Sequence, residues 1–204
     1  MSNYKTVQGE FQTKYEILRS VFICTTKGVE SFEQGIEFYR EIAKKYSNAT
    51  HNCYALTTCD SQKFSDDGEP QGTAGQPILQ VIKNNNLINV VCVVTRYFGG
   101  IKLGTGGLVS AYTKSVADCL KEATIVTKTK SLEGKIVLDY NEFSAVNNYI
   151  KSNNFIVLDT VYNDLVELSI ALPYCAKQEF NDTISRITAG KKEIEYIKET
   201  YHVY

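Results

Sequence analysis

Eight of the thirteen glycines in this chain lie between Gly68 and Gly107. Glycine readily adopts a left-handed backbone and lets other groups approach closely, but it weakens helices and strands. This density therefore predicts two loops, Phe64–Gln76 and Arg96–Gly107, in which the chain turns sharply or lies against a ligand. Between the loops, Val90–Val94 is a continuous and mostly β-branched run, which is typical of a strand buried on both faces.

The first 130 residues otherwise alternate between strand and helix patterns. Ser31 and Gln34 have the spacing of a capping box, and the apolar residues that follow recur with a helical period. We therefore expect a helix that begins after Ser31 and ends at Asn48. Pro77 suits the first turn of a helix, because its fixed φ is already helical. The further elements expected here are helices at Pro77–Asn84 and Leu108–Ala123 and strands at Tyr4–Val7, Glu16–Thr26, His51–Thr58 and Asn89–Thr95.

After Lys130 the pattern changes to two helices among four strands. The strands are expected around Ile136–Tyr140, at Phe155–Tyr162, at Leu165–Leu172 and at Ile194–Ile197, and the helices over 143–150 and 176–187. The order βαββαβ is that of the ferredoxin-like arrangement. Lys, Thr and Ser dominate Thr127–Leu132, where we expect the boundary. The sequence thus predicts an α+β protein of two domains, residues 1–130 and 133–204.

Composition excludes several classes of protein. No apolar run reaches the roughly 18–20 residues that cross a bilayer, and Met1–Glu10 is polar, without the apolar core of a signal peptide. We therefore expect a cytoplasmic protein with no membrane partner. The six cysteines form no C-x-x-C pair, and there are only two histidines, so we expect reduced cysteines, no disulfide-linked partner, no metal and no cofactor.

Charge is distributed unevenly along a chain whose net charge is −1. Gln80–Lys130 contains seven basic and two acidic residues, whereas the part from Glu133 onward contains seven basic and eleven acidic ones. A basic surface near the glycine-rich loops would attract phosphate or nucleic acid. The alternative is a scattered set of solvated lysines.

The second loop connects the buried strand to a helix, and this order is typical of an anion site. Free N–H groups and the positive end of the helix dipole meet at such a helix start. The loop is neither a Walker loop nor a G-x-G-x-x-G fingerprint. The candidate ligand- or phosphate-binding residues are Arg96, Tyr97, Gly99, Gly100, Lys102, Gly104, Thr105, Gly106 and Gly107, with Gly72, Thr73 and Gly75 from the first loop. Lys114 and Tyr112 are candidate nucleic-acid contacts, and Tyr97 or Tyr112 are candidates to stack on a base.

Three carboxylates in the first loop admit more than one interpretation. Asp66, Asp67 and Glu69 have the oxygen ligands that Mg²⁺ prefers, and they could also act as acid and base. The alternative is a structural role with neither metal binding nor catalysis: an acidic turn, in which the aspartates accept backbone hydrogen bonds. The candidate catalytic residues are Glu69 and His51, although the pattern around His51 favours a structural histidine over a catalytic one.

Three stretches together identify the chain as a member of the YigZ branch of the IMPACT family. They are Thr50–Ala55, Phe64–Pro77, which resembles the signature D-D-G-E-P-x-G-T-A-G-x-P, and Val94–Tyr112, which resembles R-Y-[FY]-G-G-x-x-L-G-x-G-G-L. The resemblance implies an N-terminal left-handed βαβ fold like the second domain of small ribosomal protein five. It implies a C-terminal ferredoxin-like domain similar to one in elongation factor G. Eukaryotic relatives regulate translation, and the family has no firmly established reaction.

Three functions follow as expectations. The first is a translation-linked regulatory protein that binds RNA, the ribosome or a phosphate-bearing ligand through loops 64–77 and 96–108. The second is an enzyme that acts on a small phosphorylated or nucleotide substrate, with Glu69 as general base. The third is a protein-interaction module that uses the acidic C-terminal domain. We rank binding above catalysis, and we leave the enzyme question open.

Overall fold

The computed structural model describes residues 3–204, which form an α+β protein with two antiparallel sheets. One compact unit comprises Lys5–Val126, and the other comprises Thr127–Tyr204 together with residues 3–4. The first two residues of the predicted N-terminal domain lie outside the described residues. Within residues 3–204, no helix is both long enough and apolar enough to cross a bilayer.

The N-terminal unit is built on a sheet with the strand order β2-β3-β6-β4-β5. The central strand is β6 (Val90–Tyr97), which pairs antiparallel with β3 (Ser20–Gly28) and β4 (His51–Thr57). The edge strands are β2 (Glu10–Ile17) and β5 (Gln62–Ser65).

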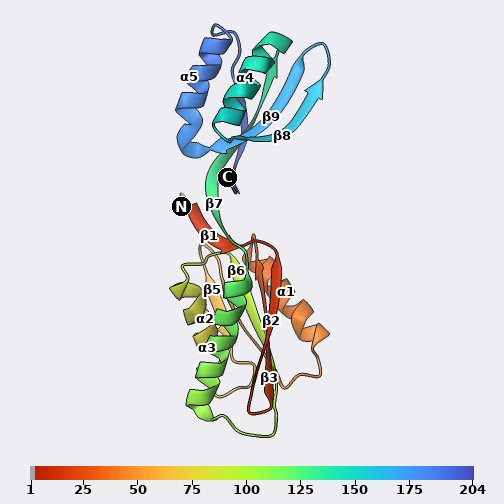
Figure 1. The fold of residues 1–204 in the computed structure, drawn as a ribbon, viewed down its shortest axis with the longest axis vertical. Coiled ribbons are helices and arrows are strands. Elements are labelled where there is room, and N and C mark those ends of the chain that lie inside the picture. The colour runs from red at the N-terminus through yellow and green to blue at the C-terminus, as the bar shows by residue number, and fades with distance from the viewer. Residues whose placement is uncertain (1–2) are drawn as a thin grey trace. The chain divides into compact units, whose positions relative to one another are not determined.

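Helices cover both faces of this sheet. Helix α1 (Phe32–Lys45) lies on one face, and α2 (Gly75–Asn84) and α3 (Gly104–Glu122) lie on the other (Figure 1). Val91 and Val93 belong to the core under α1, whereas Cys92 and Val94 belong to the core under α2 and α3. The predicted double burial of this strand is confirmed, because Val90–Val94 is wholly buried.

The predicted single strand Glu16–Thr26 is wrong, because the chain forms a hairpin there. Strands β2 and β3 are joined by Leu18 and Arg19, whose φ values are +44° and +63°. Two consecutive left-handed residues give the turn a twist that suits a tight hairpin. Neither residue is a glycine or an asparagine, so the turn has no recognisable sequence signal.

The predicted ends of two elements beside the second loop also change. Strand β6 continues to Tyr97, so Arg96 and Tyr97 lie in the strand and not in the loop. Helix α3 begins at Gly104 rather than Leu108, with Leu103 at the N-cap and no side-chain cap. The glycines of 104–107 therefore form the first turn of a helix. Glycine is unfavourable in helices, and this explains why the sequence pattern favoured a loop.

The C-terminal unit has the predicted order of elements, βαββαβ. They are β7 (Ile125–Leu138), α4 (Tyr140–Ser152), β8 (Ile156–Tyr162), β9 (Val166–Pro173), α5 (Lys177–Ile187) after a 3₁₀ turn at Tyr174–Ala176, and β10 (Glu195–His202). The sheet has the order β10-β7-β9-β8, and β1 (Asn3–Val7) also pairs with β7. Apolar side chains of α4 and α5, including Val146 and Phe180, pack on Ile136, Leu168 and Ile170.

One local prediction for the C-terminal unit needs correction, and the boundary segment has a structure of its own. Tyr140 is the first residue of α4 and not the end of a strand, because Asp139 and Glu142 form a capping box that starts the helix. Thr127–Leu132, where the boundary was expected, lies inside the continuous strand β7, where residues 129–132 pair with β10, and the two compact units divide between Val126 and Thr127. Threonine is β-branched and suits a strand, so the strand continues through this segment although its composition is polar.

Candidate functional site

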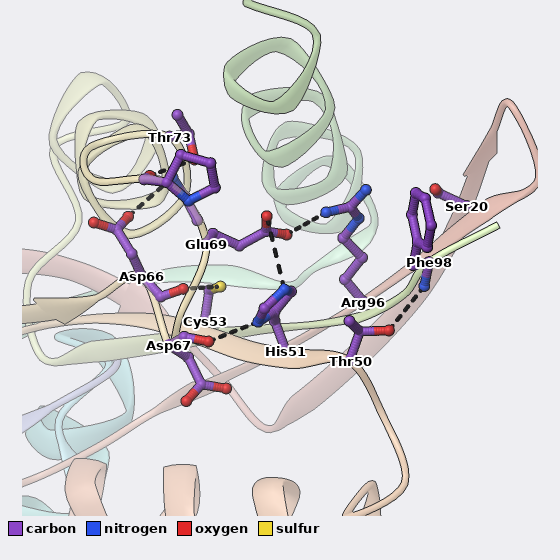
Figure 2. A network of polar contacts seen from close by, with 12 residues as sticks. Ser20, Thr50, His51, Cys53, Asp66, Asp67, Glu69, Thr73, Arg96 and Phe98 are labelled. Carbon is purple, nitrogen blue, oxygen red and sulfur yellow. Dashed lines mark hydrogen bonds and ion pairs between the residues drawn. The ribbon is translucent and has the colours of Figure 1, made fainter. Parts of the chain in front are cut away.

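The centre of the candidate site is the buried carboxylate of Glu69. This residue follows β5 in the first glycine-rich segment, and its side chain is 3% exposed. Oε1 accepts hydrogen bonds from Nη1 of Arg96 at 2.6 Å and from the hydroxyl of Tyr112 at 2.7 Å. A buried carboxylate needs such partners, because an isolated buried charge is costly. Figure 2 shows Glu69 pointing toward Arg96 and His51.

The segment that presents Glu69 is organised by Asp66. Oδ1 of Asp66 accepts the backbone N–H groups of Ala74 and Gly75 at 3.0 and 2.8 Å, and Oδ2 accepts that of Gly72 at 2.9 Å. Asp66 thus satisfies the start of α2, whose own N-cap position is an alanine without a capping side chain. The amides of Gly72 and Gly75, expected to bind an anion, are therefore already engaged within the protein.

His51, the first residue of β4, is held with one ring nitrogen fixed. Nδ1 lies 2.7 Å from the carbonyl oxygen of Asp67. A carbonyl oxygen only accepts hydrogen bonds, so Nδ1 carries a proton, and Nε2 of the neutral ring is an acceptor. Nε2 lies 3.9 Å from Oε2 of Glu69.

Arg96 projects from the end of β6 between two aromatic rings. Its guanidinium lies 5.5 Å from the ring centre of Phe22 and 5.6 Å from that of Phe98. Arg96 is 5% exposed, and within residues 3–204 its Nε is buried without a hydrogen-bond partner. An unsatisfied buried donor costs about 1–3 kcal/mol, and in native proteins such groups are concentrated where strain or function explains them.

Tyr112 and Cys53 form the buried rear of the site. The thiol of Cys53 lies 3.3 Å from the hydroxyl of Tyr112 and 3.0 Å from the carbonyl oxygen of Asp66. Burial, together with Cys53 and Glu69, holds the pKa of Tyr112 well above its usual range, so its hydroxyl is a neutral donor. Burial also raises the pKa of the Cys53 thiol, against the opposing effect of the bond to Tyr112, so this cysteine is not a reactive thiolate.

The second glycine-rich segment is positioned by the hairpin turn between β2 and β3. The N–H of Gly99 donates to Oγ of Ser20 at 3.2 Å, and a Cβ at Gly99 would collide with the backbone of Arg19 and Ser20. The neighbouring N–H of Phe98 donates to Oγ1 of Thr50 at 2.9 Å. Gly100 and Gly104 have φ values of +86° and +72°, which only glycine adopts easily.

The two segments line one pocket, which we call the Glu69 pocket. Its volume is about 440 Å³, within the range of about 300–1,000 Å³ that is usual for small-molecule sites. Four of its lining residues are ionisable or cationic, and its walls include the exposed ring of Phe98. The lining residues are Thr50, His51, Glu69, Pro70, Arg96, Phe98, Lys102, Leu103, Gly104, Thr105 and Leu108.

The structure brings six of the candidate residues to this pocket, namely His51, Glu69, Arg96, Lys102, Gly104 and Thr105. Gly99, Gly100, Gly106 and Gly107 belong to the same segment without lining the pocket, and Gly72, Thr73 and Gly75 form the turn before α2 and its first residue. Tyr97 donates to Asn48 at 2.9 Å. Lys114 pairs with Asp118 on α3 at 2.7 Å. Tyr112 is fully buried, so the prediction that it stacks on a base is wrong.

The sequence did not predict the pocket's apolar wall, to which Phe98 contributes a side chain that is 46% exposed. An aromatic side chain directly after a buried strand and before two glycines was a usable signal, because it has no core position to fill. The bond between Glu69 and Arg96 joins residues 27 apart in the chain, and no local pattern indicates it.

Neither a metal cluster nor a disulfide occurs in the described part of the chain. Over residues 3–204, no three His, Cys, Asp or Glu side chains come together in a group that could hold a metal ion. The carboxylates of the first segment are directed to separate partners, since Asp67 accepts the N–H of Asn52 at 2.6 Å. All six cysteines are free, and four of them are buried as small core residues.

Two family models match this chain. The Impact N-terminal domain matches residues 18–120, and a domain of unknown function, DUF1949, matches residues 136–191. These spans contain the glycine-rich segments with the Glu69 pocket and most of the C-terminal βαββαβ unit, respectively.

Similar proteins match over nearly the whole chain. The IMPACT family member YvyE of Bacillus subtilis is 35% identical over 98% of this chain and 94% of its own length. The IMPACT family member YigZ of Escherichia coli is 32% identical over 90% and 93%. Human Protein IMPACT is 45% identical over 30% of this chain and 20% of its own length. A crystal structure of a hypothetical protein matches with a TM-score of 0.65 and 30% identity, covering 97% of this chain and 98% of that one.

Proposed function

The chain belongs to the IMPACT family, with an Impact N-terminal domain followed by a DUF1949 domain, and on this premise we propose that it is a translation-linked regulatory protein that binds RNA through the Glu69 pocket. The observation that carries the proposal is the convergence of both glycine-rich segments on one pocket beside Arg96 and Lys102. Cationic side chains and a helix N-terminus both bind phosphate groups. Both free RNA and the RNA of the ribosome present such phosphate groups.

The surroundings of the pocket favour an anionic ligand that also has an apolar or aromatic part. Gly104 and Thr105 provide the first turn of α3, where the helix dipole is positive and no side chain of the described residues caps the helix. Phe98 offers a partly exposed ring on which a base can stack. The net charge of −1 argues against strong binding to phosphate at random over the surface, so the pocket must supply the affinity.

We also infer the two named folds that the family resemblance implies. The strand order β10-β7-β9-β8, with helices α4 and α5 packed on one face, supports a ferredoxin-like C-terminal unit. The antiparallel sheet with a parallel relation of β3 and β4 across β6 is compatible with the fold of the second domain of small ribosomal protein five. Fold kinship alone does not assign the function, which rests on the pocket.

The proposal is tested by the binding of a fluorescent single-stranded RNA at low salt, measured by anisotropy. Lys102→Ala removes a cation that lines the pocket, so we expect weaker binding and a salt dependence that is shallower by about one unit of slope. Lys114→Ala is the matched control, because Lys114 lies on α3 outside the pocket and is paired with Asp118. Failure of the unmodified protein to bind RNA at low salt, or equal losses in both variants, would refute the proposal.

A second candidate is an enzyme that acts on a small phosphorylated or nucleotide substrate. The observation in its favour is His51, whose Nδ1 is fixed by Asp67 so that the acceptor Nε2 is on the side of Glu69. Oε1 of Glu69 is occupied by two donors, so His51 suits the role of base better than Glu69 does. Incubation with a panel of nucleotides and phosphate esters, followed by mass spectrometry, tests this candidate. Turnover that His51→Gln leaves unchanged would exclude the mechanism.

A further inference from the structure

Within the Glu69 pocket, we propose that Oε2 of Glu69 accepts a hydrogen bond from a ribose hydroxyl, so that the pocket takes one ribonucleotide unit and discriminates against its 2′-deoxy counterpart. This inference rests on the proposed RNA-binding function and names the part of the ligand that the pocket reads. It concerns a hydroxyl group, and not only the phosphate that any nucleic acid supplies.

The two oxygens of the Glu69 carboxylate differ in their partners. Oε1 is saturated by Arg96 and Tyr112, whereas Oε2 has His51 at 3.9 Å, which is beyond hydrogen-bond distance. From residues 3–204, no hydrogen bond reaches Oε2, and this oxygen is not among the fully buried atoms that lack a partner, so it is open to the pocket that Glu69 lines. Ionised carboxylate oxygens are acceptors only, so the missing partner must be a donor. A ligand that brings only phosphate oxygens would leave this acceptor unsatisfied and would be repelled by it.

Arg96 provides the complementary observation on the other side of the ion pair. One of its donors is bound to Glu69, and Nε has no partner among the described residues although Arg96 is 95% buried. Lys102, Gly104 and Thr105 line the same pocket. The pocket therefore combines a carboxylate oxygen that accepts from a hydroxyl or amine with the cation of Lys102 and the start of α3, both of which favour an anion.

A ribonucleotide satisfies both needs within one unit. Its 2′-hydroxyl is a donor beside a phosphate, and its base is flat and apolar enough to stack on Phe98, which is 46% exposed and lines the pocket. An acidic side chain that binds ribose hydroxyls next to a helix N-terminus is an arrangement that other nucleotide-binding folds use. The 2′-hydroxyl is also the group by which a protein distinguishes RNA from DNA.

The test compares three versions of one short single-stranded oligonucleotide with the unmodified protein. They are the RNA, the all-2′-deoxy form and the all-2′-O-methyl form, which keeps the 2′-oxygen but loses its proton. Loss of a hydrogen bond to a charged group weakens binding about tenfold or more. We therefore expect RNA to bind at least about tenfold more tightly than either analogue. Equal affinity for RNA and the 2′-O-methyl form would overturn the ribose inference while leaving phosphate binding intact.

Two variants separate the ribose contact from the phosphate contact. Lys102→Ala should weaken RNA and DNA by the same factor and preserve their ratio, whereas Glu69→Gln should bring the ratio close to one. If Glu69→Gln does not fold, the comparison of the three oligonucleotides still decides the question. Binding of none of the three refutes the RNA proposal itself. A ribonucleoside monophosphate that displaces the RNA, where the deoxy form does not, supports the same contact with a free nucleotide as its source.

Discussion

Glu69 and Arg96 form a buried ion pair in which Oε1 and Nη1 are 2.6 Å apart and both side chains are at most 6% exposed. The pair connects the first glycine-rich segment to the end of the central strand β6. Among residues 3–204, Oε2 of Glu69 accepts no hydrogen bond and Nε of Arg96, which is fully buried, donates none. The same contact therefore stabilises the N-terminal unit and supplies the polar groups of the Glu69 pocket.

Removal of one partner of this pair should be strongly destabilising. Glu69→Ala leaves the guanidinium of Arg96 buried and uncompensated, and we expect a loss of about 3–5 kcal/mol in the free energy of unfolding. Urea unfolding followed by circular dichroism measures it. The double variant Glu69→Ala with Arg96→Met removes both charges and should recover most of the loss. A single variant that costs less than about 1 kcal/mol would show that the pair is not buried in solution.

Asp66 should be as important for the start of α2 as a conventional capping residue. Asp66→Ala removes the acceptor of three backbone N–H groups, those of Gly72, Ala74 and Gly75, and we expect a loss of about 2 kcal/mol. Hydrogen exchange should accelerate at Ala74 and Gly75 specifically. Asp60→Ala is the control, because Asp60 is exposed and should change stability by less than about 0.5 kcal/mol. Unchanged exchange at both amides would contradict the capping role.

Two glycines of the second segment should respond in opposite ways to alanine. Gly99→Ala places a methyl group against the backbone of Arg19 and Ser20, so we expect a large loss of stability. Gly106 lies in α3 with no neighbouring atom within 4 Å of an added Cβ, so Gly106→Ala should raise stability by up to about 1 kcal/mol. Melting temperatures of the two variants measure the contrast, and similar temperatures would contradict it.

The stability of the C-terminal unit should depend on the ionisation of Glu133. Burial by itself would raise the pKa of Glu133, but hydrogen bonds from Lys198 and His202 outweigh it and lower this pKa. A pKa that is lower in the folded state than in the unfolded state stabilises the fold at pH values above the unfolded value of about 4.3. This contribution is lost as the pH falls through the folded pKa.

Glu133→Gln should therefore reduce the loss of stability on acidification below about pH 4.3. Denaturant unfolding at a series of pH values measures the effect. Glu167→Gln serves as the matched control, because its pair with Lys135 is exposed and such pairs contribute little to stability. Identical pH profiles for the unmodified protein and Glu133→Gln would contradict the assignment.

Sequence patterns predicted the elements that local physics determines. The run Val90–Val94 indicated its own burial on both faces, and Ser31 with Gln34 indicated the start of α1. The order of elements after Lys130 followed from apolar periodicity in the same way. In each case the signal lies within a few residues of the element that it describes.

The features that the sequence did not predict depend on contacts between residues far apart in the chain or on unusual backbone conformations. Asp66 caps a helix that begins nine residues later, at Gly75, across a folded segment. Leu18 and Arg19 adopt left-handed conformations without glycine, because pairing of β2 with β3 imposes the turn. The candidate site was predicted as two segments and several residues, but the buried pair that joins them became visible only in three dimensions.

The contact of Gly99 with Arg19 and Ser20 places a constraint on how such chains can diverge. Gly99, next to Phe98 in the pocket wall, packs on the β2–β3 turn, and Ser20 of that turn lies 79 residues earlier in the chain. A change in the turn therefore requires a matching change in the segment around Gly99. A residue inserted into the β2–β3 turn would push its backbone into the position that Gly99 now occupies. Among relatives of this chain, hairpin length and the residue at position 99 should therefore change together or not at all.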